Sequence, residues 1–377
     1  MKIGIITIHH VYNYGAILQA FASYNIIKKY HQDVVFIDYD NTTFKSQRNI
    51  FLPCNTISNI LRNVRTLIHY KARKKKIERF ETEYKKFKLS QNHWYNTADF
   101  AKEKFDVIIT GSDQTFSLYL TGNPADMKAF FLEDVGSAKR LSFASSLGEK
   151  LHMLTTADKK WMRKCFQKFD AISVREELSA DFINELIGVR PHVVVDPTLL
   201  LTREEWIKEA TLFNYKKGEY IAFYTVLSDS WVSEYVLQIS KITNLPVVAL
   251  HPKTRYDLNT GFDYIGDAGP REFISFIKEA KYVITTSFHA TVFSILMHKK
   301  FISLKLGIGN RIGSLLSTLS LNMRFVEGIE NVEIALNRLT DDINYEKVDK
   351  ILQRQREDSI NFLITSLQKY DNKSEFA

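Results

Sequence analysis

The sequence has few cysteines, no long apolar run and no glycine-rich dinucleotide motif, and each absence excludes a class of protein. Its two cysteines, Cys54 and Cys165, have neither the spacing of a metal site nor that of a disulfide framework. No stretch approaches the roughly 18 to 20 apolar residues that span a bilayer, and the run from Ile3 to Ile8 is too short for a secretory signal. The following turn, Asn13-Tyr14-Gly15, lacks the G-x-G-x-x-G pattern of a dinucleotide site. We therefore expect a cytoplasmic protein with a reduced interior.

The net charge of +8 is concentrated in one segment. Between Arg62 and Lys88 there are eleven lysines and arginines against three glutamates, which accounts for the whole excess. The chain is therefore not a uniformly basic protein, and no DNA- or RNA-binding motif accompanies the charge. We expect no nucleic-acid partner.

An apolar stripe overlaps the start of this basic run. Six apolar residues recur there at helical spacing: Ile57, Ile60, Leu61, Val64, Leu67 and Ile68. Such a helix could make peripheral membrane contact through the basic segment 62–88, at the inner face of the membrane. It could equally pack its stripe on its own domain while its lysines face water, as amphipathic helices of globular proteins do. The sequence leaves both interpretations open, with the second the commoner arrangement.

Strand-like and helix-like segments alternate along the chain, which predicts an α/β fold. In the first half, strands are expected at 2–8, 34–38, 106–110, 140–144, 171–174 and 192–195, and helices at 16–29, 156–168 and 176–186. In the second half, strands are expected at 219–226, 246–250, 263–265, 282–286 and 301–305, and helices at 230–242, 271–279, from His289, and at 345–368. A chain of 377 residues is long enough for two domains. We predict an N-terminal Rossmann-like domain at 1–200, with a basic helical insertion near 55–90, and a linker at 201–217. We expect a second Rossmann-like domain at 218–340, which binds the donor. A helical tail at 341–377 would then pack back across the junction of the two domains.

A serine and a histidine stand where one of these strands meets a helix. The β-branched run from Tyr282 leads through Thr285 and Thr286 to Ser287, Phe288 and His289. Ligands of open α/β sheets bind at the carboxyl ends of strands, and a helix N-terminus there favours anions. Ser287 and His289 could therefore contact a phosphate or carboxylate, and the imidazole could move a proton. Taken alone, the same pattern fits a helix cap followed by a packed histidine.

Further motifs occur in a fixed order along the chain, and with the Ser-Phe-His turn they resemble the polysaccharide pyruvyl transferase family. The motifs are Asn13-Tyr14-Gly15, Gly111-Ser112-Asp113-Gln114, the segment from Ser142 to Gly148, Ile172 to Glu176, and Val195-Asp196-Pro197-Thr198-Leu199-Leu200. The resemblance extends from about Ile3 to Arg324 and is weakest at 41–99.

The resemblance to this family implies a GT-B-like fold, with two Rossmann-like domains facing a cleft. It also implies a transferase that moves pyruvate from phosphoenolpyruvate to two hydroxyls of a hexose, giving a cyclic ketal. The acceptor would be a lipid-linked precursor of a capsule, an exopolysaccharide or the cell wall, and no metal or other cofactor is expected.

This reaction needs a general acid and several groups that bind anions. His289 fits the acid, because imidazole titrates near neutrality and the position matches the family motif. Asp113 would orient or deprotonate an acceptor hydroxyl, with an Asx-turn as the alternative. The remaining candidates are Arg175, Ser287, Lys305 and Arg311 for the donor, and Asn13, Tyr14 and Gly15 for substrate. A surface salt bridge is the alternative for Arg175, and a purely structural turn fits Asn13 and Gly15 equally well. Asp196 is assigned to a turn, because it precedes Pro197.

Two other functions fit the same fold. A glycosyltransferase could use a nucleotide sugar; retaining enzymes of this fold often carry two glutamates with a fixed spacing, and Glu272 and Glu279 miss that spacing by one residue. A glycan- or lipid-binding module without catalysis would need no His289. A shift of the melting temperature by phosphoenolpyruvate or by a nucleotide sugar would separate the two enzymes.

Overall fold

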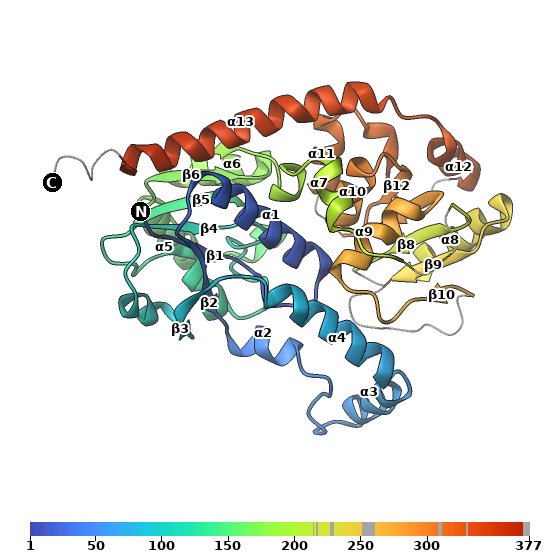
Figure 1. Cartoon of the computed structure of the whole chain (residues 1–377), viewed down its shortest axis with the longest axis horizontal. Helices are drawn as coiled ribbons and strands as arrows, with labels where there is room; N and C mark the ends of the chain where they lie inside the picture. The colour runs from blue at the N-terminus through green and yellow to red at the C-terminus, as the bar shows by residue number, and fades with distance from the viewer. Residues whose placement is uncertain are drawn as a thin grey trace.

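The computed structural model describes residues 1–213, 215, 218–226, 230–250, 261–307, 311–328 and 331–371. Its first sheet has the strand order β3-β2-β1-β4-β5-β6-β7, and every pairing is parallel (Figure 1). The strands are β1 (Ile3–Ile6), β2 (Val34–Tyr39), β3 (Leu89–Trp94), β4 (Val107–Thr110), β5 (Lys139–Ser145), β6 (Ala171–Val174) and β7 (His192–Val193). The central strands read as continuous apolar runs because helices cover both faces of the sheet.

The second sheet has the order β10-β9-β8-β11-β12-β13 and is also parallel in the part of the chain that is described. Its strands are β8 (Ile221–Tyr224), β9 (Val247–Leu250), β10 (Asp263–Tyr264), β11 (Tyr282–Thr285), β12 (Lys300–Leu304) and β13 (Phe325–Val326). The two sheets confirm the expected α/β architecture of two Rossmann-like units. The strands divide at 193 and 221, and the finer domain bounds stay a prediction.

Helices connect the strands of both sheets. The first unit contains α1 (Tyr14–Tyr30), α2 (Thr42–Gln47), α3 (Ile57–Ile68), α4 (Tyr70–Tyr84), α5 (Thr156–Phe166) and α6 (Glu177–Ile187), with short 3-10 helices η1 (Thr97–Lys102), η2 (Pro124–Phe131), η3 (Leu151–Met153) and η4 (Pro197–Leu199). After α7 (Arg203–Glu209) follow α8 (Ser230–Thr243), α9 (Pro270–Glu279), α10 (Phe288–Leu296), α11 (Arg311–Thr318), η5 (Asn322–Arg324), α12 (Val332–Thr340) and α13 (Tyr345–Asp371). Local chemistry fixes several helix starts: Asn13 caps α1, and Thr155 and Thr202 form capping boxes at α5 and α7.

Helix α13 crosses back from the second unit to the first, as Figure 1 shows. Near its start, Asp349 pairs with His298 of the second unit. Further along, Asp358 pairs with His192, and Ser359 Oγ accepts a hydrogen bond from Val195 N at 3.0 Å. The helix therefore ties the two units together, which confirms the predicted packing of the tail.

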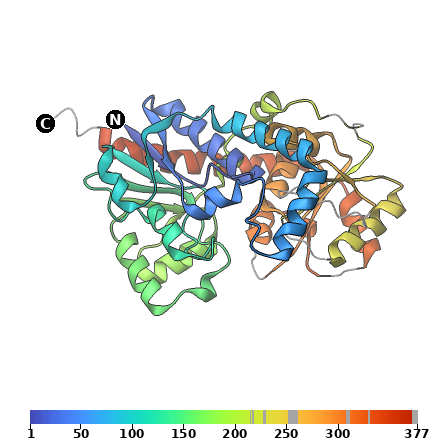
Figure 2. The same ribbon diagram turned by 90° about the horizontal axis from the view of Figure 1, so that it is seen from below.

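The structure contradicts one of the two interpretations of the apolar stripe. The basic region forms two helices, α3 and α4, that project on the lower side of Figure 1; Figure 2 views the molecule from that side. All six apolar residues of α3 are 46% to 78% exposed, so the stripe is not packed on its own domain. Several α4 cations do face the protein: Lys75 and Arg79 pair with Asp267, and Lys76 is buried over the Tyr14 ring.

Candidate functional site

Four segments place polar groups at the junction of the two units. Asp113 follows β4, Arg175 and Glu176 follow β6, Asp196 follows β7, and His289 lies in the first turn of α10, after β11. Because all these strands are parallel, their carboxyl ends meet at one edge of each sheet, where α/β proteins bind ligands. The sequence motifs thus converge in space.

Arg175 is at the centre of this cluster, and its side chain is 1% exposed. Its guanidinium donates to Asp196 Oδ2 at 2.7 Å and to Asp113 Oδ1 at 3.2 Å, and lies 3.8 Å from Glu176 Oε2. Burial alone would lower the pKa of Arg175, but the carboxylates of Asp113, Asp196 and Glu176 outweigh it and raise that pKa above its ordinary value. The guanidinium is therefore charged and already engaged by protein carboxylates.

Asp196 joins Arg175 to His289. Its side chain is 0% exposed, and Oδ2 lies 3.6 Å from His289 Nε2, a distance for an ion pair rather than a hydrogen bond. Oδ1 accepts from Thr198 N and Thr198 Oγ1. Burial raises the pKa of Asp196, but His289, Arg175 and the Thr198 bonds together hold it well below the usual range for aspartate. Asp196 is thus the turn residue expected from the sequence, and its second oxygen also faces the cluster, which sequence reasoning missed.

The ring of His289 is held between the two units. Its side chain is 11% exposed, and Nε2 is buried without a hydrogen-bond partner among the described residues. On the other side, a Cβ added to Gly15 of α1 would lie 2.1 Å from His289 Nδ1. Only glycine, which has no Cβ, lets the backbone of α1 come this close to the imidazole. Gly15 therefore leaves the space that the His289 ring occupies.

Glu176 was not identified from the sequence as a site residue. It is buried, accepts a hydrogen bond from Ser146 Oγ, and its Oε2 has no hydrogen-bond partner in the described part of the chain. Burial raises the pKa of Glu176 above its ordinary value, although Arg175 and the Ser146 hydroxyl act in the opposite direction. A buried carboxyl with a raised pKa beside other ionisable groups, here Arg175 at 3.8 Å, can hold or pass a proton. The available sequence signal was its position after a strand, next to Arg175.

The predicted donor-binding residues differ in where they lie relative to the junction of the two units. Arg311, at the start of α11, is 20% exposed and pairs with Glu149 of the first unit at 3.3 Å. Lys305 pairs with Glu327 at 3.2 Å in the second unit, and Ser287 caps α10 by accepting from Ala290 N at 3.5 Å. Arg311 therefore lies at the junction of the two units, whereas Lys305 forms its ion pair within the second unit. Residues 308–310 of the glycine-containing loop lie outside the described residues.

The three residues predicted to bind substrate, Asn13, Tyr14 and Gly15, have structural roles at the start of α1. Asn13 accepts from Gly15 N and Ala16 N as the helix cap. Tyr14 is fully buried, donates to Ala268 O at 2.9 Å and stacks on Phe273 with ring centroids 4.8 Å apart. Its ring belongs to the junction core and offers no exposed face to a sugar in this conformation. Gly15 alone contacts the His289 ring.

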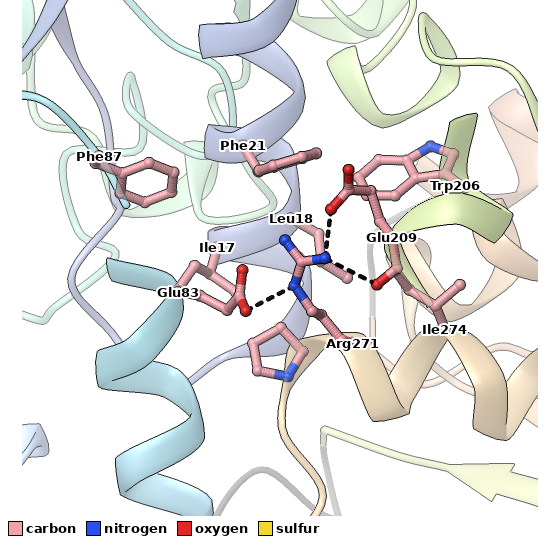
Figure 3. A pocket seen from close by; sticks show the side chains of 10 residues that line it. Ile17, Leu18, Phe21, Glu83, Phe87, Trp206, Glu209, Arg271 and Ile274 are labelled. Atoms are coloured by element: carbon pink, nitrogen blue, oxygen red, sulfur yellow. Dashed lines mark hydrogen bonds and ion pairs between the residues drawn. The ribbon is translucent and has the colours of Figure 1, made fainter. Parts of the chain in front are cut away.

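A separate small pocket at the junction lies among α1, α4, α7 and α9 (Figure 3). Arg271 reaches across it to Glu83 at 2.7 Å and to Glu209 at 2.5 Å. The rest of its lining is mainly apolar: Ile17, Leu18, Phe21, Phe87, Trp206, Pro270 and Ile274. Arg271 pairs with both carboxylates of the lining, so we assign this pocket to the packing of the two units and not to catalysis.

Comparison with known proteins gives one family and a set of distant structures. A model of the polysaccharide pyruvyl transferase family matches residues 13–306. No curated protein sequence matches the chain. Among solved structures, the UDP-GlcNAc 2-epimerase of Neisseria meningitidis bound to UDP-GlcNAc is similar with TM-score 0.57 at 11% identity, covering 98% of this chain and 100% of that one. The UDP-N-acetylglucosamine 2-epimerase of Rickettsia bellii has TM-score 0.53 at 8% identity and full coverage of both chains. At these identities the likeness shows a GT-B-type fold alone.

Proposed function

The chain belongs to the polysaccharide pyruvyl transferase family, and from that premise we propose that it forms a ketal-pyruvate on a surface-polysaccharide precursor. The donor is phosphoenolpyruvate, and the acceptor supplies two hydroxyls of one hexose. We place the reaction in the cytoplasm, on a lipid-linked acceptor at the inner face of the membrane. The reaction as proposed uses no cofactor.

The bond changes define what the site must supply. The donor methylene takes a proton and becomes the methyl group, which makes C2 electrophilic. One acceptor hydroxyl forms a C–O bond to C2, the bond from C2 to the phosphate oxygen breaks, and the second hydroxyl closes the ring. Of the two hydroxyl protons, one replaces the proton given to the methyl group and the other leaves with phosphate. A single acid that is recharged in each turnover therefore suffices.

His289 beside Asp196 is the observation that carries this proposal. The buried carboxylate of Asp196 lies 3.6 Å from Nε2 of the imidazole, and this nitrogen has no hydrogen-bond partner among the described residues. His289 would protonate the methylene, and Asp196 would orient and stabilise the imidazolium. Asp113, whose side chain is 15% exposed, would orient an acceptor hydroxyl.

Anion binding falls chiefly to Arg311 and to the N-termini of α10 and α11. Arg175 has three carboxylates around it, so its proposed contact with the donor requires that one of them release it. In the described part of the chain Arg311 pairs with the partly exposed Glu149, and a donor phosphate could replace that carboxylate. Ser287 and Lys305 would complete the donor site.

Phosphate release is the direct test of the reaction. Protein is incubated with phosphoenolpyruvate and a panel of lipid-linked or simple glycosides, and phosphate is measured against a His289→Ala control. Acceptor-dependent release by wild type, lost in the variant, supports the proposal. Background release with every acceptor would contradict it.

Thermal unfolding separates the donor from a nucleotide sugar. We expect phosphoenolpyruvate to raise the melting temperature of wild type, and less so that of His289→Ala. A rise with UDP-GlcNAc alone would instead favour the glycosyltransferase. In the structure Glu272 accepts from Gly269 N and pairs with Arg79, so one of the two glutamates of that alternative is already engaged.

A further inference from the structure

Helix α3 presents its apolar face to solvent. The exposed fractions are 78% for Ile57, 60% for Leu61 and for Leu67, and 72% for Ile68. With Ile60 and Val64 these residues fall within an arc of about 120° when drawn at 100° per residue. Phe51 and Tyr70, stacked on each other with centroids 6.2 Å apart, add two partly exposed aromatic rings at the end of the helix.

The polar face of α3 is turned toward its own chain. Asn63 donates to Leu52 O and accepts from Leu52 N, both at 2.9 Å. Asn59 donates to Pro53 O at 2.9 Å, and Thr66 Oγ1 accepts from Arg73 at 3.2 Å. These bonds fix the orientation of the helix with the apolar stripe outward. This is the reverse of a helix that packs on a globular core.

The segment around α3 carries charge of one sign. No aspartate or glutamate occurs between Asp40 and Glu78, whereas lysine or arginine occupies positions 45, 48, 62, 65, 71, 73, 74, 75 and 76. Arg62, Lys71 and Lys74 are exposed. Lys75 pairs with Asp267 of the second unit. Lys74 lies 3.9 Å from Glu78 in a solvent-exposed pair, and its side chain is still 57% exposed.

We propose that α3 is a membrane-docking helix that lies in the interface of an anionic lipid bilayer. Its apolar stripe would enter the boundary between headgroups and acyl chains, and Arg62, Lys71 and Lys74 would contact anionic headgroups. No described helix is long and apolar enough to cross a bilayer, so α3 would rest on the membrane rather than span it. A second copy of the chain fits this face poorly. A two-fold contact would bring the acid-free, cationic segment against itself.

The position of this helix relates the membrane to the junction of the two units. Helix α4 runs from α3 to the junction, where Lys76 lies 4.8 Å from the Tyr14 ring centroid and Arg79 pairs with Glu272 of α9. The next residue after Tyr14 is Gly15, which contacts His289. A lipid-linked substrate would thus be held beside the site. The docking proposal itself does not depend on which reaction occurs there.

Vesicle co-sedimentation of the full chain tests the apolar stripe. We compare vesicles of phosphatidylcholine alone with vesicles that also contain the anionic lipid phosphatidylglycerol. Wild type is expected to bind the anionic vesicles, and Leu61→Asn with Leu67→Asn to weaken binding roughly tenfold or more. The matched control is Leu178→Asn with Leu212→Asn, two leucines that are 55% and 84% exposed elsewhere. All four leucines are largely exposed, so equal melting temperatures confirm that folding is intact.

The cations are tested separately. The triple variant Arg62→Gln, Lys71→Gln, Lys74→Gln should lose about a hundredfold in affinity for anionic vesicles, at about fivefold per cation. The control Lys347→Gln, Lys350→Gln, Arg354→Gln removes the same charge from exposed positions of α13 and should bind as wild type. Binding of wild type should fall as salt rises from about 0.05 M to about 0.5 M.

Three results would overturn the proposal. The first is that wild type fails to bind anionic vesicles at low salt. The second is that each control variant loses as much binding as its α3 counterpart. The third is that the Leu61 and Leu67 variant turns a dimer into a monomer in light scattering while vesicle binding is unchanged, which would assign the face to a second copy. Phosphate release with a simple glycoside as acceptor, in the absence of any lipid, does not depend on these outcomes. Failure of the docking helix and failure of the proposed reaction are therefore distinguishable.

Discussion

Gly15 and His289 touch across the junction of the two units. A Cβ built on Gly15 would lie 2.1 Å from Nδ1 and 2.4 Å from Cγ of the imidazole, closer than any real carbon approaches. Gly15 is in the first turn of α1, and His289 is in the first turn of α10. The start of a helix in one unit therefore sets where the histidine of the other unit can be.

Replacing Gly15 with alanine should disturb both stability and catalysis. The added methyl must displace the ring or separate the units, and overpacking of this kind costs about 1–3 kcal/mol in the free energy of unfolding. A displacement of about 1 Å at a reacting group can lower the rate about a hundredfold. Denaturant unfolding and phosphate release would measure the two effects.

The same substitution in a His289→Ala background is its control. With the ring removed, Gly15→Ala should lose most of its cost to stability, because the two positions are coupled through direct contact. An equal cost in both backgrounds would mean that the methyl clashes with something other than the imidazole.

Asp196→Asn should destabilise the protein strongly and reduce turnover. The amide keeps an oxygen for Thr198 but leaves Arg175 without its 2.7 Å partner and His289 without its carboxylate. Removing one partner of a buried pair costs about 3–5 kcal/mol. The matched control is Asp349→Asn, which breaks a second histidine–aspartate pair whose carboxylate is 48% exposed. Similar losses in both variants would contradict the special position of Asp196.

Acid stability gives an independent measure of Asp196. The folded protein holds the pKa of this carboxyl below its unfolded value, so the resulting stability is fully present above about pH 4 and is lost as pH falls further. The difference in unfolding free energy between wild type and Asp196→Asn should therefore shrink below about pH 4. A constant difference down to lower pH would show that charge plays no part.

Glu176→Gln has the opposite pH dependence. Burial raises the folded pKa of Glu176, so its contribution to stability is fully present below about pH 4.3, the unfolded value, and is lost as pH rises through the folded pKa. Relative to wild type, the glutamine variant should gain stability as pH rises through that interval. Its neighbour Glu177, which is 63% exposed, supplies the control Glu177→Gln, for which we expect no such trend. A relative loss of stability with rising pH would refute the assignment.

Most strands were predictable because they combine β-branched runs with turns. The run from Tyr282 to Thr285 is an example: it forms β11, and Ser287 caps the following helix as the pattern indicates. Strand β3 was missed, because it lies at the sheet edge and has four consecutive polar residues between Leu89 and Trp94 instead of an apolar run. Periodicity also predicted the stripe of α3, but it cannot tell which way the stripe faces. That depends on the hydrogen bonds of Asn63 to Leu52.

The site was only partly predictable, because some of its residues serve two neighbours. From the sequence, Asp196 was assigned to a turn, and its Oδ1 does bond Thr198 in that role. Its other oxygen meets Arg175 and His289, which are distant in sequence and approach only when the two units pack. Tyr14 also has a structural role, because its ring fills the core between the units. Its contact with substrate stays a prediction.

Arg311 and Lys305 should differ as donor-binding residues, although the sequence weighs them equally. Arg311 faces the first unit through Glu149, whereas Lys305 pairs within its own unit with Glu327, which is 58% exposed. A charge-assisted contact to a donor phosphate contributes about 1.5–3 kcal/mol, so Arg311→Gln should raise KM for phosphoenolpyruvate roughly tenfold or more. Lys305→Gln should change it much less. Initial rates of phosphate release at varied donor concentration measure both, with Glu149→Gln as a third variant. That variant frees Arg311 and should leave KM for phosphoenolpyruvate unchanged or lower it.

Two results would contradict this assignment: a higher KM in Glu149→Gln, or an equal rise of KM in Arg311→Gln and Lys305→Gln. Either would mean that the Arg311–Glu149 pair serves only to hold the two units together.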